Sequence, residues 1–250
     1  MQPSVMWKEL TAEDLRAQAA AKATVVLPVA SMEQHGPHLP VGVDTILCEG
    51  VCKAAAELVA GKMPVVVAPT LWCGMAEHHM AMGGTFTFDI PTYRAVLLAF
   101  LKSIERHGFE RVFIVNGHGG NIAALASFLP DFARETRLQV RATTYFELAQ
   151  PAIAALLEDQ QSVRHACEAE TSMMLALAPE RVKRDRFGEA HGDPSVNTRP
   201  VVARFRSYAK LTASGVIGDA RRATAEKGEK LVAACAAALA DALTDPQTWS

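Results

Sequence analysis

The stretch VVLPVASMEQHGPHLPVGVD (residues 25–44) joins an apolar run to a loop rich in Gly and Pro, after which a helical pattern begins. The run is nearly continuous in Val, Leu and Ala, which is typical of a strand buried on both faces of a parallel sheet. Four possible metal ligands lie on the loop: Glu33, His35, His38 and Asp44. The stretch therefore indicates an α/β fold with a site at the carboxyl end of a strand.

Further strand-like runs and helical patterns alternate along the chain. Asp89 and Pro91 suit the start of one helix, and Pro130 is expected to kink or split another. The alternation predicts a three-layer α/β/α sandwich with a mostly parallel central sheet. Residues 184–215, rich in Arg, Gly, Pro and Ser, are expected to form a lid or an oligomer contact. The expected strands are 25–31, 64–72, 111–117 and 139–147, and the expected helices are 44–60, 91–107, 121–135 and about 221–243.

Length and composition narrow the class of protein. The chain has 250 residues, half of them hydrophobic, and a formal net charge of -2. This suits one domain over residues 1–250 and gives no basic footprint for nucleic acid. No run reaches the roughly 18 apolar residues of a membrane span, and the N-terminus lacks the features of a signal peptide. The five cysteines form no CxxC pair, which argues against a disulfide framework. We expect a cytoplasmic protein with a small-molecule partner and neither a nucleic-acid nor a membrane partner.

Polar side chains follow two of the expected strands. Glu33 and His35 are two residues apart, so an extended chain points both to one side. His118 follows the strand-like run RVFIVNG, and its loop meets the first if the two strands are neighbours. Asp44 can cap the next helix or reach a metal, and the two roles do not exclude each other. Mixed carboxylate and imidazole ligands suit Zn²⁺, Mn²⁺ or Fe²⁺.

Three more segments carry candidate residues. Gly119, Gly120 and Asn121 open a helix whose N–H groups favour an anion, which makes them candidates for substrate binding. EHHMAMGGT (77–85) adds Glu77 and His78 as candidates of the same kind.

The third segment is RHACEAETS (164–172). His165 and Glu168 are three residues apart, which on a helix places them on the same face, while Glu170 begins another face. The helix dipole alone also favours acids at a helix start, so these residues need not be functional. GxSxG, Walker and GxGxxG motifs are absent, so neither a serine nucleophile nor a nucleotide site is expected.

Together these segments resemble the creatininase family of metal-dependent amidohydrolases. The resemblance implies an α/β/α sandwich, a two-metal centre, hydrolysis of a non-peptide or cyclic C–N bond by a metal-bound hydroxide, and a homohexamer. The matching segments follow the family's order from residue 32 to residue 228: MEQHGPHLPVGVD, EHHMAMGGTFTF, HGFERVFIVNGHGGN, RHACEAETS and GVIGDARRATAEKG.

The resemblance also implies roles for individual residues. Glu33 and His118 match ligands of one metal, and His35 matches a ligand of the other. Asp44 matches the ligand that bridges the two metals. His165 matches a residue that assists proton transfer.

Two departures from creatininase proper bear on this assignment. Creatininase proper has a Glu at the position of Gly120, so the second metal needs another carboxylate. Glu170 is the candidate ahead of Glu168, which is then expected beside His165 in the catalytic set. Creatininase proper also places Trp residues over its substrate, whereas the tryptophans here are far from the matching positions, which disfavours creatinine: Trp7, Trp72 and Trp249.

The leading hypothesis is a metal-dependent hydrolase of a cyclic amide, lactam or formamide that holds two divalent cations per chain and forms a homo-oligomer. One alternative is a mononuclear hydrolase in which only Glu33, Asp44 and His118 bind metal. A second is a peptidase that trims a modified peptide, and a third is a non-catalytic metal-binding protein. The sequence does not determine the amide.

Overall fold

A four-stranded parallel sheet forms the centre of the computed structural model, which describes residues 4–198 and 200–250. The strands lie in the order β2-β1-β3-β4. β1 pairs with β3 along its whole length, so the loops that follow these two strands leave the sheet side by side. The strands are β1 (Thr24–Val29), β2 (Val65–Val67), β3 (Arg111–Asn116) and β4 (Gln139–Thr144).

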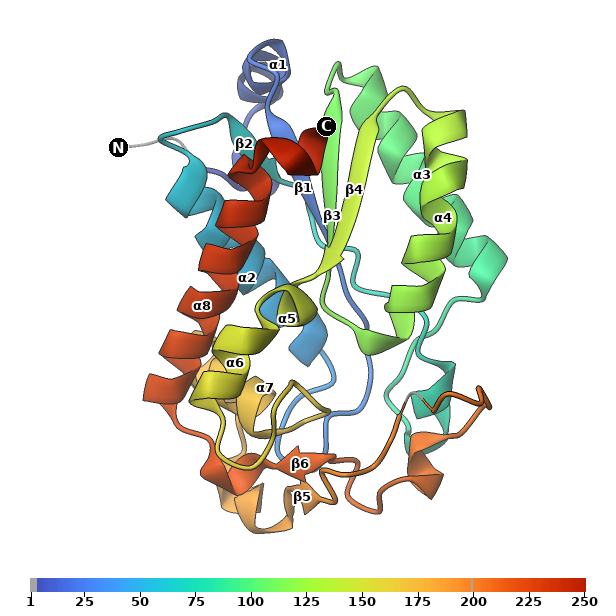
Figure 1. Ribbon diagram of the computed structural model, residues 1–250, viewed down its shortest axis with the longest axis vertical. Coiled ribbons are helices and arrows are strands. Elements are labelled where there is room, and N and C mark those ends of the chain that lie inside the picture. The colour runs from blue at the N-terminus through green and yellow to red at the C-terminus, as the bar shows by residue number, and fades with distance from the viewer. Residues whose placement is uncertain (1–3, 199) are drawn as a thin grey trace.

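Helices cover both faces of this sheet, which confirms the predicted three-layer sandwich (Figure 1). Val25, Leu27 and Val29 of β1 belong to the core beneath one layer, and Val26 belongs to the core beneath the other. The continuous apolar run in the sequence therefore reflects burial on both faces. One layer holds α3 (Ile90–Arg106) and α4 (Ile122–Glu135), and the other holds α2 (Val43–Val59), α5 (Tyr145–Leu148), α6 (Gln150–Leu156), α7 (Glu168–Leu177) and α8 (Ala225–Thr244), while α1 (Ala12–Ala20) precedes β1.

Several expected elements differ from the structure, among them the strand expected over 139–147, which ends at Thr144 where α5 begins. The strand expected over 64–72 is limited to β2, because Pro69 has no N–H to donate to a ladder. The helix expected to split at Pro130 continues through it as α4. Leu125, Phe128 and Phe132 of that helix are buried against the sheet, and this packing offsets the hydrogen bond that Pro130 cannot make.

A further difference concerns His165, which was expected on a helix with Glu168. α7 begins at Glu168, and His165 instead forms an isolated antiparallel bridge with Ile217. Ala166 between them has a positive φ of 51°. This sharp bend turns the chain into α7, so the helical spacing does not apply to His165 and Glu168.

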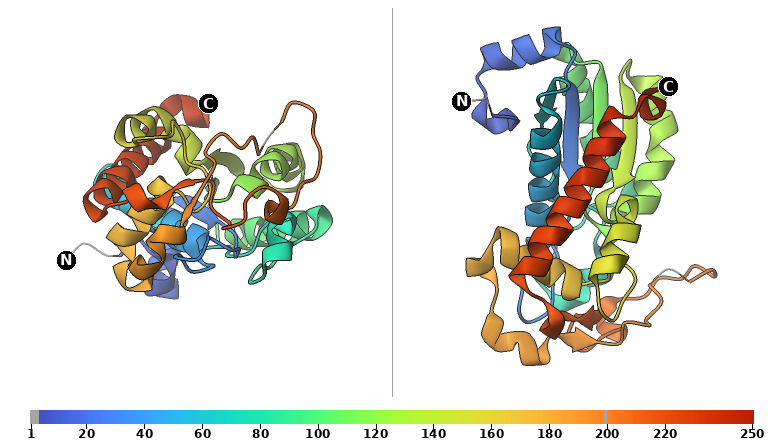
Figure 2. Two further views of the ribbon diagram at one scale, coloured as in Figure 1. Left: turned by 90° about the horizontal axis from the view of Figure 1, so that it is seen from below. Right: turned by 60° about the vertical axis from the view of Figure 1, so that its left-hand side comes forward.

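The segment expected as an excursion, 184–215, has little regular structure. Its elements are short: β5 (His191–Gly192), which pairs with β6 (Gly218–Asp219), and the 3-10 helices η5 (Arg184–Glu189) and η6 (Tyr208–Lys210). Figure 2 shows part of the segment projecting from the molecule beyond the ends of the strands.

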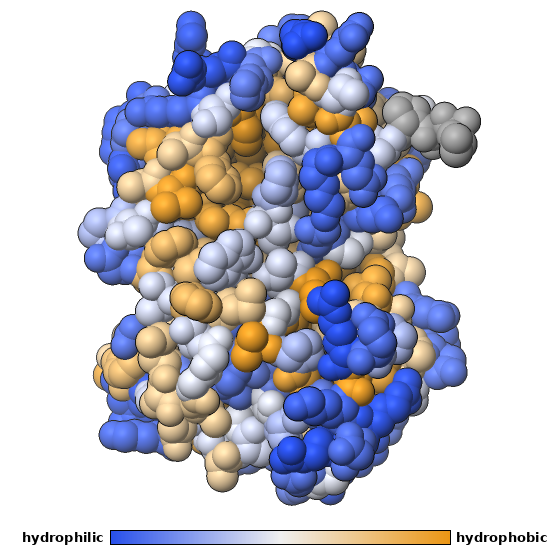
Figure 3. Space-filling view, turned by 180° about the vertical axis from the view of Figure 1, so that it is seen from behind, coloured by the Kyte–Doolittle hydropathy of each residue, from blue (hydrophilic) through white to orange (hydrophobic). Residues whose placement is uncertain are grey.

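The surface mixes hydrophilic and hydrophobic side chains, which gather in several separate patches on the face shown in Figure 3. Within residues 4–198 and 200–250, every helix is too short or too polar to cross a membrane.

Candidate active site

Five side chains from four elements meet at the carboxyl end of the sheet. Glu33 and His35 come from the loop after β1, His118 from the loop after β3, Asp44 from α2 and Glu170 from α7. All five are buried, and each belongs to at least one of several overlapping groups that could hold a metal ion, groups that also include His78, His79 and His165. The structure therefore brings together every residue that the sequence assigned to metal binding.

Asp44 lies between two sets of ligands. Its Oδ1 is 3.1 Å from Nε2 of His35, and its Oδ2 is 3.0 Å from Nδ1 of His118. Gly42, not Asp44, is the N-cap of α2, and no side chain caps that helix. The capping role considered for Asp44 is therefore wrong, and its carboxylate is free to serve both sets.

The first set comprises Glu33, His118 and Asp44. Nδ1 of His118 lies 3.1 Å from Oε2 of Glu33. On the other side of the ring, Nε2 lies 3.2 Å from the carbonyl oxygen of Met75, to which it donates a hydrogen bond. This bond places the ring proton on Nε2 and leaves the lone pair of Nδ1 facing the two carboxylates, the usual arrangement of a metal-binding histidine.

The second set comprises His35, Asp44 and Glu170. Nδ1 of His35 donates to the backbone oxygen of Glu33 at 3.1 Å, which leaves Nε2 as the bare nitrogen. This nitrogen faces Asp44 and lies 3.9 Å from Oε2 of Glu170. Glu170 thus lies where the second set needs a carboxylate.

Divalent cations fit these two sets. Oε2 of Glu33, Nε2 of His35 and Oδ2 of Asp44 are buried without a hydrogen-bond partner. In the described part of the chain, the ion pairs of Glu33, Asp44 and Glu170 are with histidines and not with Lys or Arg. Three buried carboxylates without a permanent cation are costly, and bound metal ions would remove that cost.

The pKa values of the metal-free site also indicate that it binds cations. Burial lowers the pKa of His35, but Asp44, Glu170 and Glu33 outweigh it and raise that pKa to about 9. Burial also opposes protonation of His118, yet Glu33 and Asp44 hold its pKa well above the usual value. Burial raises the pKa of Glu170 to about 7. The site therefore takes up protons where a cation is missing, and a bound cation would displace them.

At Gly120, where the family resemblance implies a Glu in creatininase proper, no side chain fits. A Cβ at Gly120 would lie 2.3 Å from the carbonyl oxygen of Met75 and 2.4 Å from Nε2 of His118. The ring of His78 lies 2.8 Å from the same point. The backbone of Met75 and the stacked imidazoles of His78 and His118 occupy this space, and the carboxylate that lies beside His35 is that of Glu170.

Gln34 connects two more histidines to the site. Nε2 of His165 donates to the backbone oxygen of Gln34 at 2.8 Å, so its Nδ1 faces Oε1 of Glu33 at 3.6 Å. The side-chain amide of Gln34 lies 3.1 Å from Nδ1 of His79, whose Nε2 is 3.2 Å from the same Glu33 oxygen. His165 is thus placed beside the metal ligands, and burial lowers its pKa well below the usual value.

Tyr208 was missed by the sequence analysis, and His79, which lies in the same EHHMAMGGT segment as Glu77 and His78, was not chosen as a site residue. Neighbouring residues of the short helix η2 (Glu77–Met82) point in different directions, and the spacing could not decide between His78 and His79. Tyr208 lies in η6, with its ring centroid 3.9 Å from that of His79 and 4.8 Å from that of His165. Burial raises the pKa of Tyr208, so its hydroxyl keeps its proton.

Three other expected site residues lie apart from the metal ligands. Glu168 is buried but turns toward α8, where it pairs with Lys227 and accepts from the backbone N–H of Glu158. Glu77 is exposed. The side chain of Asn121 accepts from the N–H of Met75 and donates to backbone and side-chain oxygens beneath the loop, so it supports the loop instead of facing substrate.

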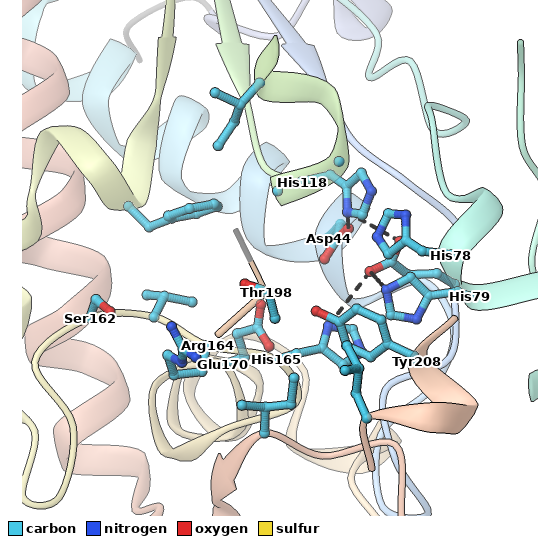
Figure 4. Close-up of a pocket in the computed structure, with 18 of the residues that line it drawn as sticks. Asp44, His78, His79, His118, Ser162, Arg164, His165, Glu170, Thr198 and Tyr208 are labelled. Carbon is cyan, nitrogen blue, oxygen red and sulfur yellow. Dashed lines mark ion pairs between the residues drawn. The ribbon is translucent and has the colours of Figure 1, made fainter. Parts of the chain in front are cut away.

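A cavity of about 570 Å³ opens onto the ligand sets (Figure 4). His78, Gly119 and Gly120 line it, as the sequence predicted for substrate contact, together with His165 and Tyr208. Its volume suits a small-molecule substrate. No Trp in the described ranges lines it, and its larger aromatic side chains are Phe146, Phe205 and Tyr208.

A buried, metal-binding set of carboxylates and imidazoles under a small-molecule cavity defines a metal-dependent enzyme. The family model for creatininase, creatinine amidohydrolase, matches residues 8–243, and the chain belongs to the creatininase family. It is a metal-dependent amidohydrolase, as the motifs predicted.

Characterised relatives include enzymes of more than one kind. Creatinine amidohydrolase of Pseudomonas putida is 29% identical, with 98% of each chain covered. The mycofactocin precursor peptide peptidase of Mycobacterium ulcerans is 30% identical over 84% of this chain and 80% of its own. A solved structure described as a Mn creatininase superposes with a TM-score of 0.84 at 29% identity, covering 96% of this chain and 97% of that one.

Proposed function

We propose that the protein holds two divalent cations per chain and hydrolyses a non-peptide C–N bond of a small cyclic amide, lactam or formamide. Glu33, Asp44 and His118 would hold one cation, and His35, Asp44 and Glu170 the other. The observation that carries this proposal is the position of Asp44, whose two oxygens face the two sets at 3.0 and 3.1 Å.

The chemistry of the ligands narrows the choice of cation to Zn²⁺, Mn²⁺ or Fe²⁺. When bound, such cations polarise a carbonyl oxygen and lower the pKa of water. The chain itself fixes the ligands, because Met75 and the backbone of Glu33 each accept a ring proton from one metal-binding histidine. Two rings with a fixed tautomer bind metal with little loss of freedom.

His165 is the residue proposed to move a proton. Its imidazole is neutral near pH 7 because burial lowers its pKa, so Nδ1 can accept a proton from water and release it to the leaving nitrogen. Tyr208 lies against the ring of His165, and its protonated hydroxyl can donate to an oxygen that gains charge during attack. Glu168 takes no part, because Lys227 pairs with it away from the cavity.

The cavity favours a small amide over a peptide. Its volume of about 570 Å³ is that of a small-molecule site. Creatinine is disfavoured because no Trp of the described residues lines the cavity and Gly120 replaces a carboxylate. The similarity to a peptide peptidase makes a short peptide the necessary comparison substrate.

Metal analysis and a substrate panel test this proposal together. The protein is saturated with Mn²⁺ or Zn²⁺, freed of unbound metal by gel filtration, and analysed for metal and protein in the same sample. Two ions per chain are expected, and a single ion would establish the mononuclear alternative. Cyclic amides, lactams and formamides are then assayed beside creatinine and a peptide, and cleavage of the peptide alone would make the protein a peptidase.

We also propose that residues 1–250 form one creatininase-like domain that assembles as a homo-oligomer, a hexamer by family resemblance. The support is the projecting segment, where Val201, Val202 and Phe205 are largely exposed to solvent. Exposed apolar side chains gathered on one segment are typical of a contact surface. Light scattering at several protein concentrations tests the assembly, and a monomer at all of them would contradict it.

A further inference from the structure

The cavity above the metal ligands has a second, basic side. Arg164 lines it next to His165, and Arg204 and Arg206 line it from the projecting segment. Figure 4 shows Arg164 and Ser162 on one side of the pocket and Asp44, His78 and His118 on the other. Glu170 is labelled near Arg164, whereas Asp44 lies on the far side of the pocket with His78 and His118, so Arg164 is separated from most of the ligands that would hold cations.

Arg164 is a cation with unused hydrogen-bond donors. Its Nη2 donates to the backbone oxygen of Val196. Its Nε is buried and has no hydrogen-bond partner. In residues 4–198 and 200–250, no carboxylate forms an ion pair with Arg164. A guanidinium carries five donors, and a buried donor left without an acceptor is costly.

The two arginines of the projecting segment also lack acidic partners. Arg206 donates to the backbone oxygen of Asn197, and neither Arg204 nor Arg206 pairs with a carboxylate of the described residues. Three cationic side chains thus line one cavity, and the acids that line it among the described residues are the proposed metal ligands Glu33, Asp44 and Glu170, together with Glu147. A ligand with negative charge at this end would meet complementary charge.

Resting on the proposed amidohydrolase function, we propose that the substrate carries an anionic group, a carboxylate or a phosphate, and that Arg164 binds this group while the amide lies at the metal ligands. The planar guanidinium matches both oxyanions, because its donors are fixed in a fork that spans two oxygens. Arg164 and His165 both line the cavity, so an anionic group bound by Arg164 would fix the position of the amide relative to the residue that moves a proton. Arg204 and Arg206 line the same cavity and add positive charge to it.

Three amides of matched length test this assignment: succinamide, succinamate and 3-phosphonopropanamide. They share the same primary amide and differ only in a neutral, carboxylate or phosphonate end. Binding to the metal-saturated protein is measured by calorimetry, so no turnover is needed. A charge-assisted hydrogen bond predicts that at least one anionic compound binds about 10- to 100-fold more tightly than succinamide. The two anionic arms then show whether a carboxylate or a phosphate fits.

Bound cations also attract anions, so variants are needed to distinguish the contribution of Arg164 to anion binding from that of the cations. Arg164→Gln should lower the ratio of the affinities for the anionic compound and for succinamide to about one, and Arg164→Lys should keep part of the wild-type ratio. Arg106→Gln, an exposed arginine of α3 outside the cavity, is the matched control and should leave the preference unchanged.

Three results would overturn the assignment. Equal binding of all three compounds to the wild-type protein would show that the basic end binds no anion. An anion preference that survives Arg164→Gln would place the anion on the cations. If Arg164 only anchors Val196, Arg164→Gln weakens all three compounds alike and leaves their ratio unchanged, which also refutes the role. An anion preference without hydrolysis of any amide would instead contradict the proposed function and leave the anion site standing.

Discussion

Replacing Asp44 by Asn is the sharpest test of a site with two cations. The substitution keeps the shape of the side chain and removes its charge. Because the two oxygens of Asp44 face His35 and His118 separately, the change weakens both cation sites at once. A charge pair about 4 Å apart at an effective dielectric constant of about 20 is worth roughly 4 kcal/mol. Asp44→Asn should therefore weaken the binding of each ion at least about 1,000-fold.

Calorimetric titration of the metal-free protein with Mn²⁺, together with metal analysis after gel filtration, measures this loss. Asp89→Asn is the matched control, because Asp89 is the true N-cap of α3 and its Oδ1 accepts from the N–H of Thr92 at 2.9 Å. Asn caps a helix as well as Asp does, so the control should keep its metal and its stability.

The thermal unfolding temperature supplies a second measurement. Wild-type protein and the control should be stabilised by added Mn²⁺, because the folded state alone binds it. Asp44→Asn should gain little from Mn²⁺, and its metal-free form should unfold below the wild-type temperature because the buried ion pairs of Asp44 with His35 and His118 are lost. Two ions per chain bound by Asp44→Asn with wild-type affinity would refute the bridging role.

Three further predictions follow from the site. His165→Ala should lower turnover about 100- to 10,000-fold and keep the metal, whereas Glu170→Gln should lose metal as well; the reverse pattern in paired rate and metal measurements would make His165 the ligand. Gly120→Glu should not restore a creatininase-like ligand, because its Cβ would lie 2.3 Å from the oxygen of Met75, and it should lower the free energy of unfolding by about 1–3 kcal/mol in denaturant titrations. Because the pKa of His35 is raised to about 9, a cation that binds below this pH must displace its proton. The affinity for Mn²⁺ should therefore rise at least about tenfold per pH unit between about pH 6 and about pH 8. A pH-independent affinity in calorimetry would contradict this prediction.

The sequence by itself determined the layers of the fold and the parallel sheet. Apolar runs such as residues 25–30 are buried on both faces because helices cover both sides of the sheet. A continuous apolar run in the sequence is therefore enough to predict this burial. It also placed Glu33, His35 and His118 after strands, where parallel sheets bind ligands. The resemblance of the motifs then predicted that these residues share a metal site with Asp44 and that the chain belongs to the creatininase family.

Only the tertiary structure decided which side chains share the cavity and what each one faces. The sequence spacing predicted His165 and Glu168 on one helix face. Because the chain bends at Ala166, His165 instead lies beside the metal ligands and Glu168 pairs with Lys227. Tyr208 and Arg164 lie in two different segments with little regular structure, the first in 184–215 and the second between α6 and α7, so no sequence periodicity predicts their positions. Contacts between residues distant in sequence depend on how the whole chain packs, and a pattern of neighbouring residues carries no information about them.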